Sequence, residues 1–139
     1  MREADCIFCK IARQEIPTPL VYENESAAAF LDIAPLAEGH LLVIPRSHYT
    51  HLADMPANVC SAIGALLPRL GQALMSVTEA EGFNVLQNNG RAAGQAVEHV
   101  HFHLIPRKAG DNLGYRWNAG QYAPGRDAKL LSAYKNALV

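Results

Sequence analysis

Three of the six histidines of this 139-residue chain fall within five consecutive positions. His99, His101 and His103 alternate with the apolar residues Val100 and Phe102. Alternate side chains of an extended strand point to the same face, so this spacing predicts three imidazoles in a row on one face of a sheet. Such a row gives up apolar burial, and it therefore indicates a face at which the rings do chemistry.

Two chemistries suit this row. Two alternate rings can bind one zinc ion, but the ends of the run would lie about 13 Å apart along the strand, so we do not expect all three on one ion. The second chemistry is nucleophilic catalysis, in which a neutral imidazole attacks phosphorus while its neighbours stabilise the developing charge. His101 is flanked on both sides and is the natural nucleophile. The loop at residues 88–95 offers side-chain amides and backbone N–H groups beside glycines, which suits a phosphate.

A second chemical signal is the pair Cys6 and Cys9, which are separated by two residues. A redox pair of this spacing is expected beside a βαβ pattern, which the chain lacks. The pair therefore indicates two of the four ligands of a structural zinc, and the remaining ligands must be histidines. Cys60 falls in an apolar helical pattern and is expected in the core.

Hydrophobic periodicity predicts the elements that position these residues. We expect strands over residues 20–23, 27–33, 40–45, 83–87 and 97–105, the last ended by Pro106. We expect helices over residues 7–13, 57–79 and 127–138, the long one kinked at Pro68. The strands lie on both sides of the long helix without a βαβ rhythm, so the predicted class is α+β with a mainly antiparallel sheet.

Composition limits the classes of function. Half of the residues are apolar and 18% are charged, which excludes a disordered chain, and the net charge of −1 does not indicate a nucleic-acid binder. Residues 1–40 carry three basic and seven acidic groups, whereas residues 107–139 carry six basic and two acidic groups. The N-terminus is charged and no apolar run approaches the length of a span of about 18 residues, so we expect a cytoplasmic protein without a membrane anchor.

The run from Gly94 to Ile105 resembles the signature of the histidine triad (HIT) family, in which three histidines alternate with apolar residues. Segments 7–11, 29–35 and 39–45 resemble the other blocks of this family in the same order, and the resemblance covers residues 6–108. The chain is most similar to the Hint-like nucleoside phosphoramidase branch, in its bacterial form with the Cys-x-x-Cys pair.

The resemblance implies a HIT-like fold with a five-stranded sheet, a short N-terminal helix, a long central helix and a C-terminal helix. It implies a single domain over residues 1–139, with a core at 6–108 and a tail and helix at 109–139. It also implies a homodimer, and residues 113–117 are candidates to cross it and shape the leaving-group side.

The resemblance also implies roles for individual residues. His101 would attack the α-phosphorus of a purine nucleoside 5′-monophosphate derivative and form a nucleotidyl-histidine, His103 would bind the phosphate oxygens, and His40 would orient this face. Asp32 would bind the ribose. The other residues implied in substrate binding are Asn88, Gln95 and Ala96 near the phosphate and Ile7, Phe8, Ile11, Phe30, Leu31 and Ile33 around the base.

Zinc-bearing members of the family imply that His48 and His99 complete a structural site with Cys6 and Cys9, and His51 is an alternative ligand. Two other functions stay open. One is a hydrolase of dinucleoside polyphosphates. The other is a nucleotide sensor or partner-binding module with little turnover, because Ala96 stands where many Hint-like members carry a hydroxyl residue.

Overall fold

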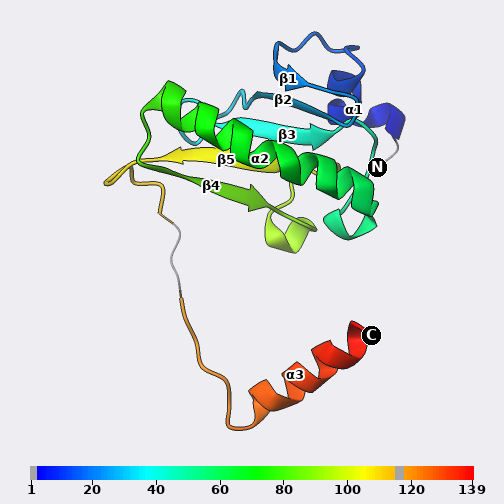
Figure 1. The fold of residues 1–139 in the computed structure, drawn as a ribbon, viewed down its shortest axis with the longest axis vertical. Helices are drawn as coiled ribbons and strands as arrows, with labels where there is room; N and C mark the ends of the chain where they lie inside the picture. Colours follow the sequence, from blue (N-terminus) through cyan, green and yellow to red (C-terminus); the bar gives the residue numbers. More distant parts are fainter. Residues whose placement is uncertain (1–2, 115–117) are drawn as a thin grey trace.

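Five antiparallel strands form one sheet in the order β1-β2-β3-β5-β4 in the computed structural model, which describes residues 3–114 and 118–139 (Figure 1). This arrangement confirms the expected α+β class. The bounds of the strands are β1 (Leu20–Glu23), β2 (Ala27–Leu31), β3 (Leu41–Pro45), β4 (Gly82–Gln87) and β5 (Phe102–Arg107).

The central strand β3 is buried on both faces, because helices cover the two sides of the sheet. Leu41 and Val43 face the long helix α2 (Ala57–Thr78), which crosses the sheet in Figure 1. Leu42 and Ile44 pack instead with Phe8 of the short helix α1 (Ile7–Ala12). Alternation along one apolar strand therefore supplies two cores, and the α1 side also receives the histidines.

Helix α2 continues through Pro68, so the prediction of one long helix is confirmed. Its buried positions Ile63, Leu66, Leu70 and Leu74 recur at three- and four-residue steps and pack on the sheet. By length and composition alone it is the one helix in the described ranges that could cross a bilayer. Because its apolar stripe contacts β3 and β5, it is the core helix of this domain.

The expected strand over residues 97–105 is wrong in its first half. β5 begins at Phe102, and the backbone bends at residues 97–99. The bend lets Val100 N–H donate to the carbonyl of Tyr49 at 2.7 Å and turns the His99 ring towards Cys6. These contacts offset the loss of the strand hydrogen bonds that the backbone before Phe102 does not make.

β5 also continues through Pro106, where the sequence predicts its end. The ladder with β3 covers only Phe102–Leu104 of this strand, whereas Pro106 pairs with Phe83 of β4. The missing N–H of Pro106 therefore removes no bond to β3. At β2, by contrast, the expected strand over 27–33 ends at Leu31, because Asp32 closes a turn with its Oδ1 accepting from Ala34 N–H.

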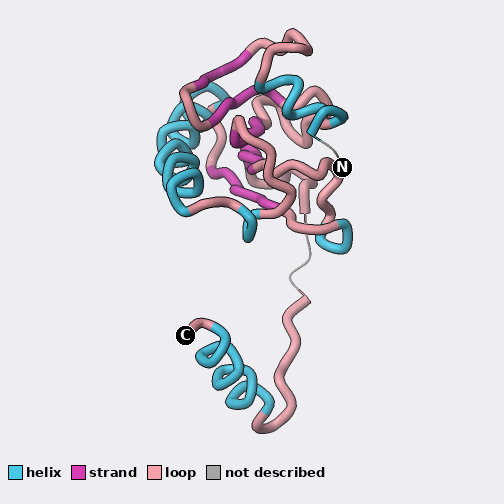
Figure 2. Tube along the Cα trace, turned by 90° about the vertical axis from the view of Figure 1, so that its right-hand side faces the viewer, coloured by secondary structure: helices cyan, strands magenta, loops and turns pink. Residues whose placement is uncertain are grey.

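The remaining helices are short or remote from the sheet. Three 3-10 turns lie at Glu3–Asp5, Leu52–Asp54 and Arg91–Ala93. The terminal helix α3 (Arg126–Ala137) stands well away from the sheet in both views (Figures 1 and 2). Of the segment 113–117 that the sequence places near a dimer partner, residues 115–117 lie outside the described part of the chain.

Candidate active site

The three rings of the histidine run follow one another on the α1 side of the sheet, although only His103 lies within β5. The ring centroids of His101 and His103 are 5.0 Å apart. Phe8 from α1 places its ring edge-on to both His99 and His101, at 5.9 and 5.1 Å. The bend before β5 therefore separates His99 from the strand without moving its ring to the other face.

His101 is held in one tautomer by the backbone. Its Nδ1 lies 2.7 Å from the carbonyl oxygen of His99, and a carbonyl oxygen only accepts, so Nδ1 carries the proton. In the neutral ring, Nε2 then carries the free electron pair. Because His101 is buried and Phe8 packs on its ring, this nitrogen has the fixed orientation that a nucleophile needs.

His40 and His103 are joined by a hydrogen bond whose direction is fixed by their tautomers. Leu36 N–H donates to Nδ1 of His40 at 3.1 Å, so the proton of the neutral His40 ring is on Nε2. That Nε2 lies 2.9 Å from Nδ1 of His103, which must accept, and His103 therefore carries its own proton on Nε2. These two hydrogen bonds therefore leave His103 Nε2–H as a donor. A donor at this position can stabilise negative charge that develops on a phosphate.

Burial keeps this pair neutral. Burial, together with the neighbouring rings of His101 and His40, lowers the pKa of His103 to about 4. Burial also lowers the pKa of His40, although the carboxylate of Asp32 opposes the shift. Asp32 Oδ2 lies 3.7 Å from His40 Nε2, so Asp32 lies beside the histidine pair, where its predicted role in substrate binding would require it.

The loop before the histidines is anchored by Gln95. This side chain is buried, its Oε1 accepts from Gly90 N–H at 2.7 Å, and its Nε2 donates to the carbonyl of Thr50 at 2.7 Å. Both ends of the amide thus bind the protein itself. Gly90 and Gly94 have φ values of 86° and 94°, a region that favours glycine. Sequence reasoning missed Thr50 and Leu36, because their contributions come from the backbone.

The apolar residues predicted around a base fall into two groups. Phe8, Ile11 and Phe30 are buried in the core on the α1 side, and Phe8 contacts the histidine rings directly. The other three lie at the surface of the same region: Ile7, Leu31 and Ile33, the last 98% exposed. The structure therefore gives Phe8 a place at the site and places Ile11 and Phe30 behind it.

A pocket of about 700 Å³ lies on the β4 side of the row. Leu86, which is paired with His103 across β4 and β5, lines it together with Asn88 and Leu36. At the other end it is lined by Arg107, which is held by Asp111 through two bonds of 2.7 and 3.0 Å. Asn88 thus lies where the loop and the pocket meet. Ala96 is exposed at the end of the same loop.

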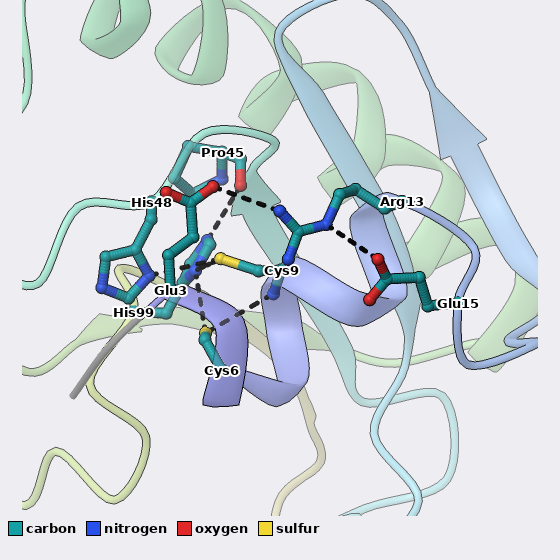
Figure 3. A network of polar contacts seen from close by, with 8 residues as sticks. All are labelled: Glu3, Cys6, Cys9, Arg13, Glu15, Pro45, His48 and His99. Carbon is teal, nitrogen blue, oxygen red and sulfur yellow. Dashed lines mark hydrogen bonds and ion pairs between the residues drawn. The ribbon is translucent and has the colours of Figure 1, made fainter.

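A separate group joins the two cysteines to two histidines (Figure 3). The ligand atoms of Cys6, Cys9, His48 and His99 all lie within 4.8 Å of one another. The Sγ–Nδ1 distances are 3.3 Å for Cys6 and His99, 3.3 Å for Cys9 and His48, and 3.5 Å for Cys9 and His99. Sulfur and nitrogen ligands of one tetrahedral zinc are separated by about 3.6 Å.

Protonation in this group is set by its burial. Burial lowers the pKa of His99 to about 4, and its Nε2 donates to the carbonyl of Pro45 at 2.9 Å, which leaves the electron pair on Nδ1 facing the cysteines. Burial and the adjacent Cys6 raise the pKa of Cys9 to about 12. The alternative ligand His51 lies outside the group, with its Nδ1 3.7 Å from Asp54.

Comparison with known proteins decides the family. The model of the HIT domain matches residues 13–110, which is more than half of the chain. The chain belongs to the HIT family. This assignment confirms the resemblance read from the histidine run, and the Hint-like relatives below agree with the predicted branch.

Curated HIT proteins match over most of the chain. The adenosine 5′-monophosphoramidase HNT1 of Candida albicans is 46% identical over 121 residues, covering 84% of the chain and 80% of that protein. Protein hit of Bacillus subtilis is 41% identical over 123 residues, covering 86% and 85%. The adenylylsulfatase HINT3 of Arabidopsis thaliana is 44% identical over 109 residues, which cover 78% of the chain but only 55% of that protein. The chain is an enzyme of the HIT family.

Solved HIT structures share the fold. A Streptococcus mutans protein superposes with a TM-score of 0.92 at 37% identity, covering 97% of the chain and 86% of its own. A Bacillus subtilis HIT protein gives 0.91 at 36% identity, covering 97% and 98%. A zinc-bound histidine triad protein from Mycobacterium smegmatis gives 0.76 at 33% identity, covering 99% and 100%.

Proposed function

We propose that this HIT enzyme hydrolyses the P–N or P–O bond at the α-phosphate of purine nucleoside 5′-monophosphate derivatives through a covalent intermediate on His101. The observation that carries the proposal is the contact of His101 Nδ1 with the carbonyl of His99, since it leaves Nε2 free to attack. Relatives named as a monophosphoramidase and an adenylylsulfatase act on this class of bond, which supports the same substrate class here.

The reaction divides into two displacements. His101 Nε2 attacks phosphorus, the bond to the leaving group breaks, and the leaving amine takes up a proton from solvent. Water then adds to the phosphorus of the nucleotidyl-histidine, the P–Nε2 bond breaks with its electron pair returning to the ring, and the water releases one proton. His103 Nε2–H donates to the phosphate oxygens in both steps, in the orientation set by His40.

The substrate extends in two directions from the histidines. We place the ribose at Asp32, with the base near Phe8 and the exposed Ile7, Leu31 and Ile33. The leaving group enters the pocket beside Leu86, with Asn88 at the phosphate. Ala96 retains only its backbone N–H for this role.

The Cys/His group fits a structural zinc. Four ligand atoms of the types zinc prefers converge, and with all four positions filled by protein the ion would bind no water for catalysis. A zinc ion there supplies rigidity, and the zinc-bound Mycobacterium relative supports this choice of metal. We further propose that the enzyme acts in the cytoplasm. We also propose that it is a homodimer, because β4 leaves an apolar edge of the sheet exposed.

Trapping of the intermediate tests the proposal. The protein is mixed with an adenosine 5′-phosphoramidate, quenched in acid-free denaturant and measured by intact-mass spectrometry, and we expect an adenylate adduct that maps to His101. His101→Ala should lose both the adduct and turnover, whereas His51→Gln, a substitution of an exposed histidine outside the site, should keep both. An active His101→Ala variant would refute the mechanism.

Two further measurements separate the other functions. Faster hydrolysis of a diadenosine polyphosphate than of the phosphoramidate would instead support a dinucleoside polyphosphate hydrolase. Negligible turnover of both substrates with intact nucleotide binding would support a sensor. In that case Ala96→Ser should raise the rate if the missing hydroxyl limits catalysis, by up to about 3 kcal/mol of transition-state stabilisation.

A further inference from the structure

Cys6 and Cys9 lie within reach of each other at the start of helix α1 (Figure 3). Both are free cysteines, and the Sγ of Cys6 accepts from the N–H of Cys9 at 3.4 Å. This contact folds the Cys6 side chain back over the first turn of the helix, and the two Sγ atoms lie within 4.8 Å of each other. Cα atoms three residues apart in a helix are separated by about 5 Å, and a disulfide needs about 4.4–6.8 Å. The backbone of this turn therefore suits a disulfide between the two residues.

The chemistry of the Cys/His group makes the two sulfur atoms targets of oxidation. A cysteine that binds zinc does so as the thiolate, which is also the form that oxidants attack. Both residues are buried, with exposed fractions of 0% and 1%. The 3-10 turn Glu3–Asp5 lies against them, since the Cys6 N–H donates to the Glu3 carbonyl at 3.1 Å, and none of its residues is buried. A short exposed turn opens locally more readily than a core element, so this burial admits a small oxidant and excludes a bulky one.

The same sulfur atoms hold the ring of the residue that orients His101. Nδ1 of His99 lies 3.3 Å from the Sγ of Cys6 and 3.5 Å from the Sγ of Cys9, and the carbonyl of His99 accepts from Nδ1 of His101. A disulfide would draw the sulfur atoms towards each other and would leave neither of them a thiolate. The group would then lose two of its four ligands, and the His99 ring would lose both of its sulfur neighbours.

We propose that Cys6 and Cys9 form a reversible disulfide that turns the enzyme off, with a hydroperoxide as the oxidant. The inference rests on the structural zinc of the proposed function, and its effect on turnover rests on His101 as the nucleophile. The disulfide releases the metal and frees the His99 ring, so the carbonyl that fixes the tautomer of His101 is no longer held in place.

The reaction takes two steps at sulfur. The thiolate of one cysteine attacks a peroxide oxygen, the O–O bond breaks, and the other oxygen leaves as an alcohol, or as water from hydrogen peroxide, after taking up a proton from solvent. The thiolate of the second cysteine attacks the sulfenic sulfur, the S–O bond breaks, and hydroxide takes up a second proton and leaves as water. The two sulfur atoms together lose two electrons, which the peroxide gains.

This disulfide differs from that of an enzyme that exchanges disulfides with other proteins. Such an enzyme presents an accessible cysteine to its partner, whereas both cysteines here are buried. The described strands also form an antiparallel sheet rather than the βαβ units in which such pairs are expected. The disulfide therefore modifies this chain and does not serve a protein substrate.

Oxidation of a Cys60→Ser variant tests the modification, because this change removes the third thiol and leaves the Cys/His group intact. The zinc-loaded variant is treated with hydrogen peroxide beside a zinc indicator, quenched with catalase, alkylated and digested with trypsin without reduction. Cleavage after Arg2 and Lys10 gives peptide 3–10, which contains both remaining cysteines. We expect this peptide to lose two hydrogen atoms in step with the release of one zinc ion per chain, and dithiothreitol to reverse the loss. Zinc release with peptide 3–10 still alkylated, or carrying sulfinic acid, would overturn the disulfide.

NMR of ¹⁵N-labelled imidazoles measures the effect on His101 without a substrate. The reduced protein should show one His101 tautomer, protonated on Nδ1, and the oxidised protein should show both tautomers in exchange. The bond between His40 and His103 involves neither cysteine, so the signals of these two rings should not change. A disulfide that leaves the His101 signal unchanged would refute the switch, and loss of all three signals would show unfolding and would refute it as well.

Turnover of an adenosine 5′-phosphoramidate completes the test. Oxidation should lower kcat by at least about tenfold, and dithiothreitol with zinc should restore it. A loss of kcat that persists after peptide 3–10 is reduced and zinc is restored would contradict a reversible switch. Reduced protein that binds no zinc, or that has no turnover, would instead refute that part of the proposed function, and the peptide and the His101 signal would still decide whether the disulfide forms and frees His101.

Discussion

His101 Nδ1 donates to the backbone carbonyl of His99 at 2.7 Å, while the side chain of His99 belongs to the Cys/His group. His99 thus orients the proposed nucleophile with its backbone and takes part in the Cys/His group with its ring. The ring is itself fixed from the other side by Pro45. We therefore expect any change that frees the His99 ring to loosen the hold on His101, the proposed nucleophile.

This relationship predicts the effect of losing a cysteine. Cys9→Ser should lower the zinc content well below one ion per chain and reduce kcat, because His99 loses its neighbour and the His101 contact relaxes. Cys60→Ser removes a thiol that is outside the group and should change neither quantity. Zinc is measured by atomic absorption beside steady-state kinetics. Full zinc occupancy in Cys9→Ser would exclude this ligand set.

Zinc binding should also release protons. The pKa of the Cys9 thiol, raised to about 12, means that the metal-free thiol is protonated at neutral pH, whereas zinc binds the thiolate. Titration of zinc into metal-free protein in a weakly buffered dye solution should acidify it, and the apparent affinity should rise with pH. Zinc binding that is independent of pH would contradict this ligand chemistry.

His40 should act through His103 rather than on the substrate. His40→Ala removes the donor to His103 Nδ1, so His103 can turn or change tautomer, and we expect kcat to fall about tenfold to a hundredfold, less than the largest losses seen for a direct oxyanion donor. KM should change little. His40→Gln keeps an N–H group and should restore part of kcat. A His40→Ala variant that loses affinity instead would place His40 in substrate binding.

Stability should decrease in mild acid through His103. Its pKa is about 4 in the folded protein and about 6.5 in the unfolded chain, so between these values the unfolded chain binds more protons. The free energy of unfolding should therefore fall as pH drops from 6.5 towards 4, by about 1–2 kcal/mol from this partly exposed group. Urea unfolding across this range measures the slope. His103→Gln should flatten it, and an unchanged slope would refute the assignment.

The sequence predicted the order of the elements and the shared face of the histidine rings, because the apolar run of Leu41–Pro45, the helical period of residues 57–79 and the alternation of the histidines are local signals. It did not predict the bend at residues 97–99. That bend is stabilised by the carbonyl of Tyr49 and by Cys6, which are distant in sequence, and alternation of His99 with Val100 reads as a plain strand.

The sequence also did not show what each polar side chain binds. Asp32, His40 and His103 are brought together by the pairing of β3 with both β2 and β5, which no local pattern specifies. The free position of α3 was equally hidden, because an amphipathic helix has the same periodicity whether it packs on its own core or on another chain. The features that the sequence did not predict are therefore those that depend on contacts between residues distant in the chain.

Gln95 provides the sharpest test of the loop that precedes the histidines. Its buried amide binds Gly90 N–H and the carbonyl of Thr50, so it ties the loop to the segment that follows His48. Gln95→Ala leaves both backbone groups without this partner and should lower the free energy of unfolding by about 2–4 kcal/mol. Gln87→Ala, in a half-buried glutamine with contacts only to neighbouring residues, should cost less than about 1 kcal/mol.

Gln95→Glu separates anchoring from substrate contact. A carboxylate keeps the acceptor for Gly90 but faces the carbonyl of Thr50 without a donor, so the variant should be nearly as unstable as Gln95→Ala. If Gln95 acts by positioning the loop, kcat should fall in both variants in proportion to their loss of stability while nucleotide affinity holds. Nucleotide affinity that falls in Gln95→Glu with stability unchanged would instead show direct contact between this side chain and the phosphate.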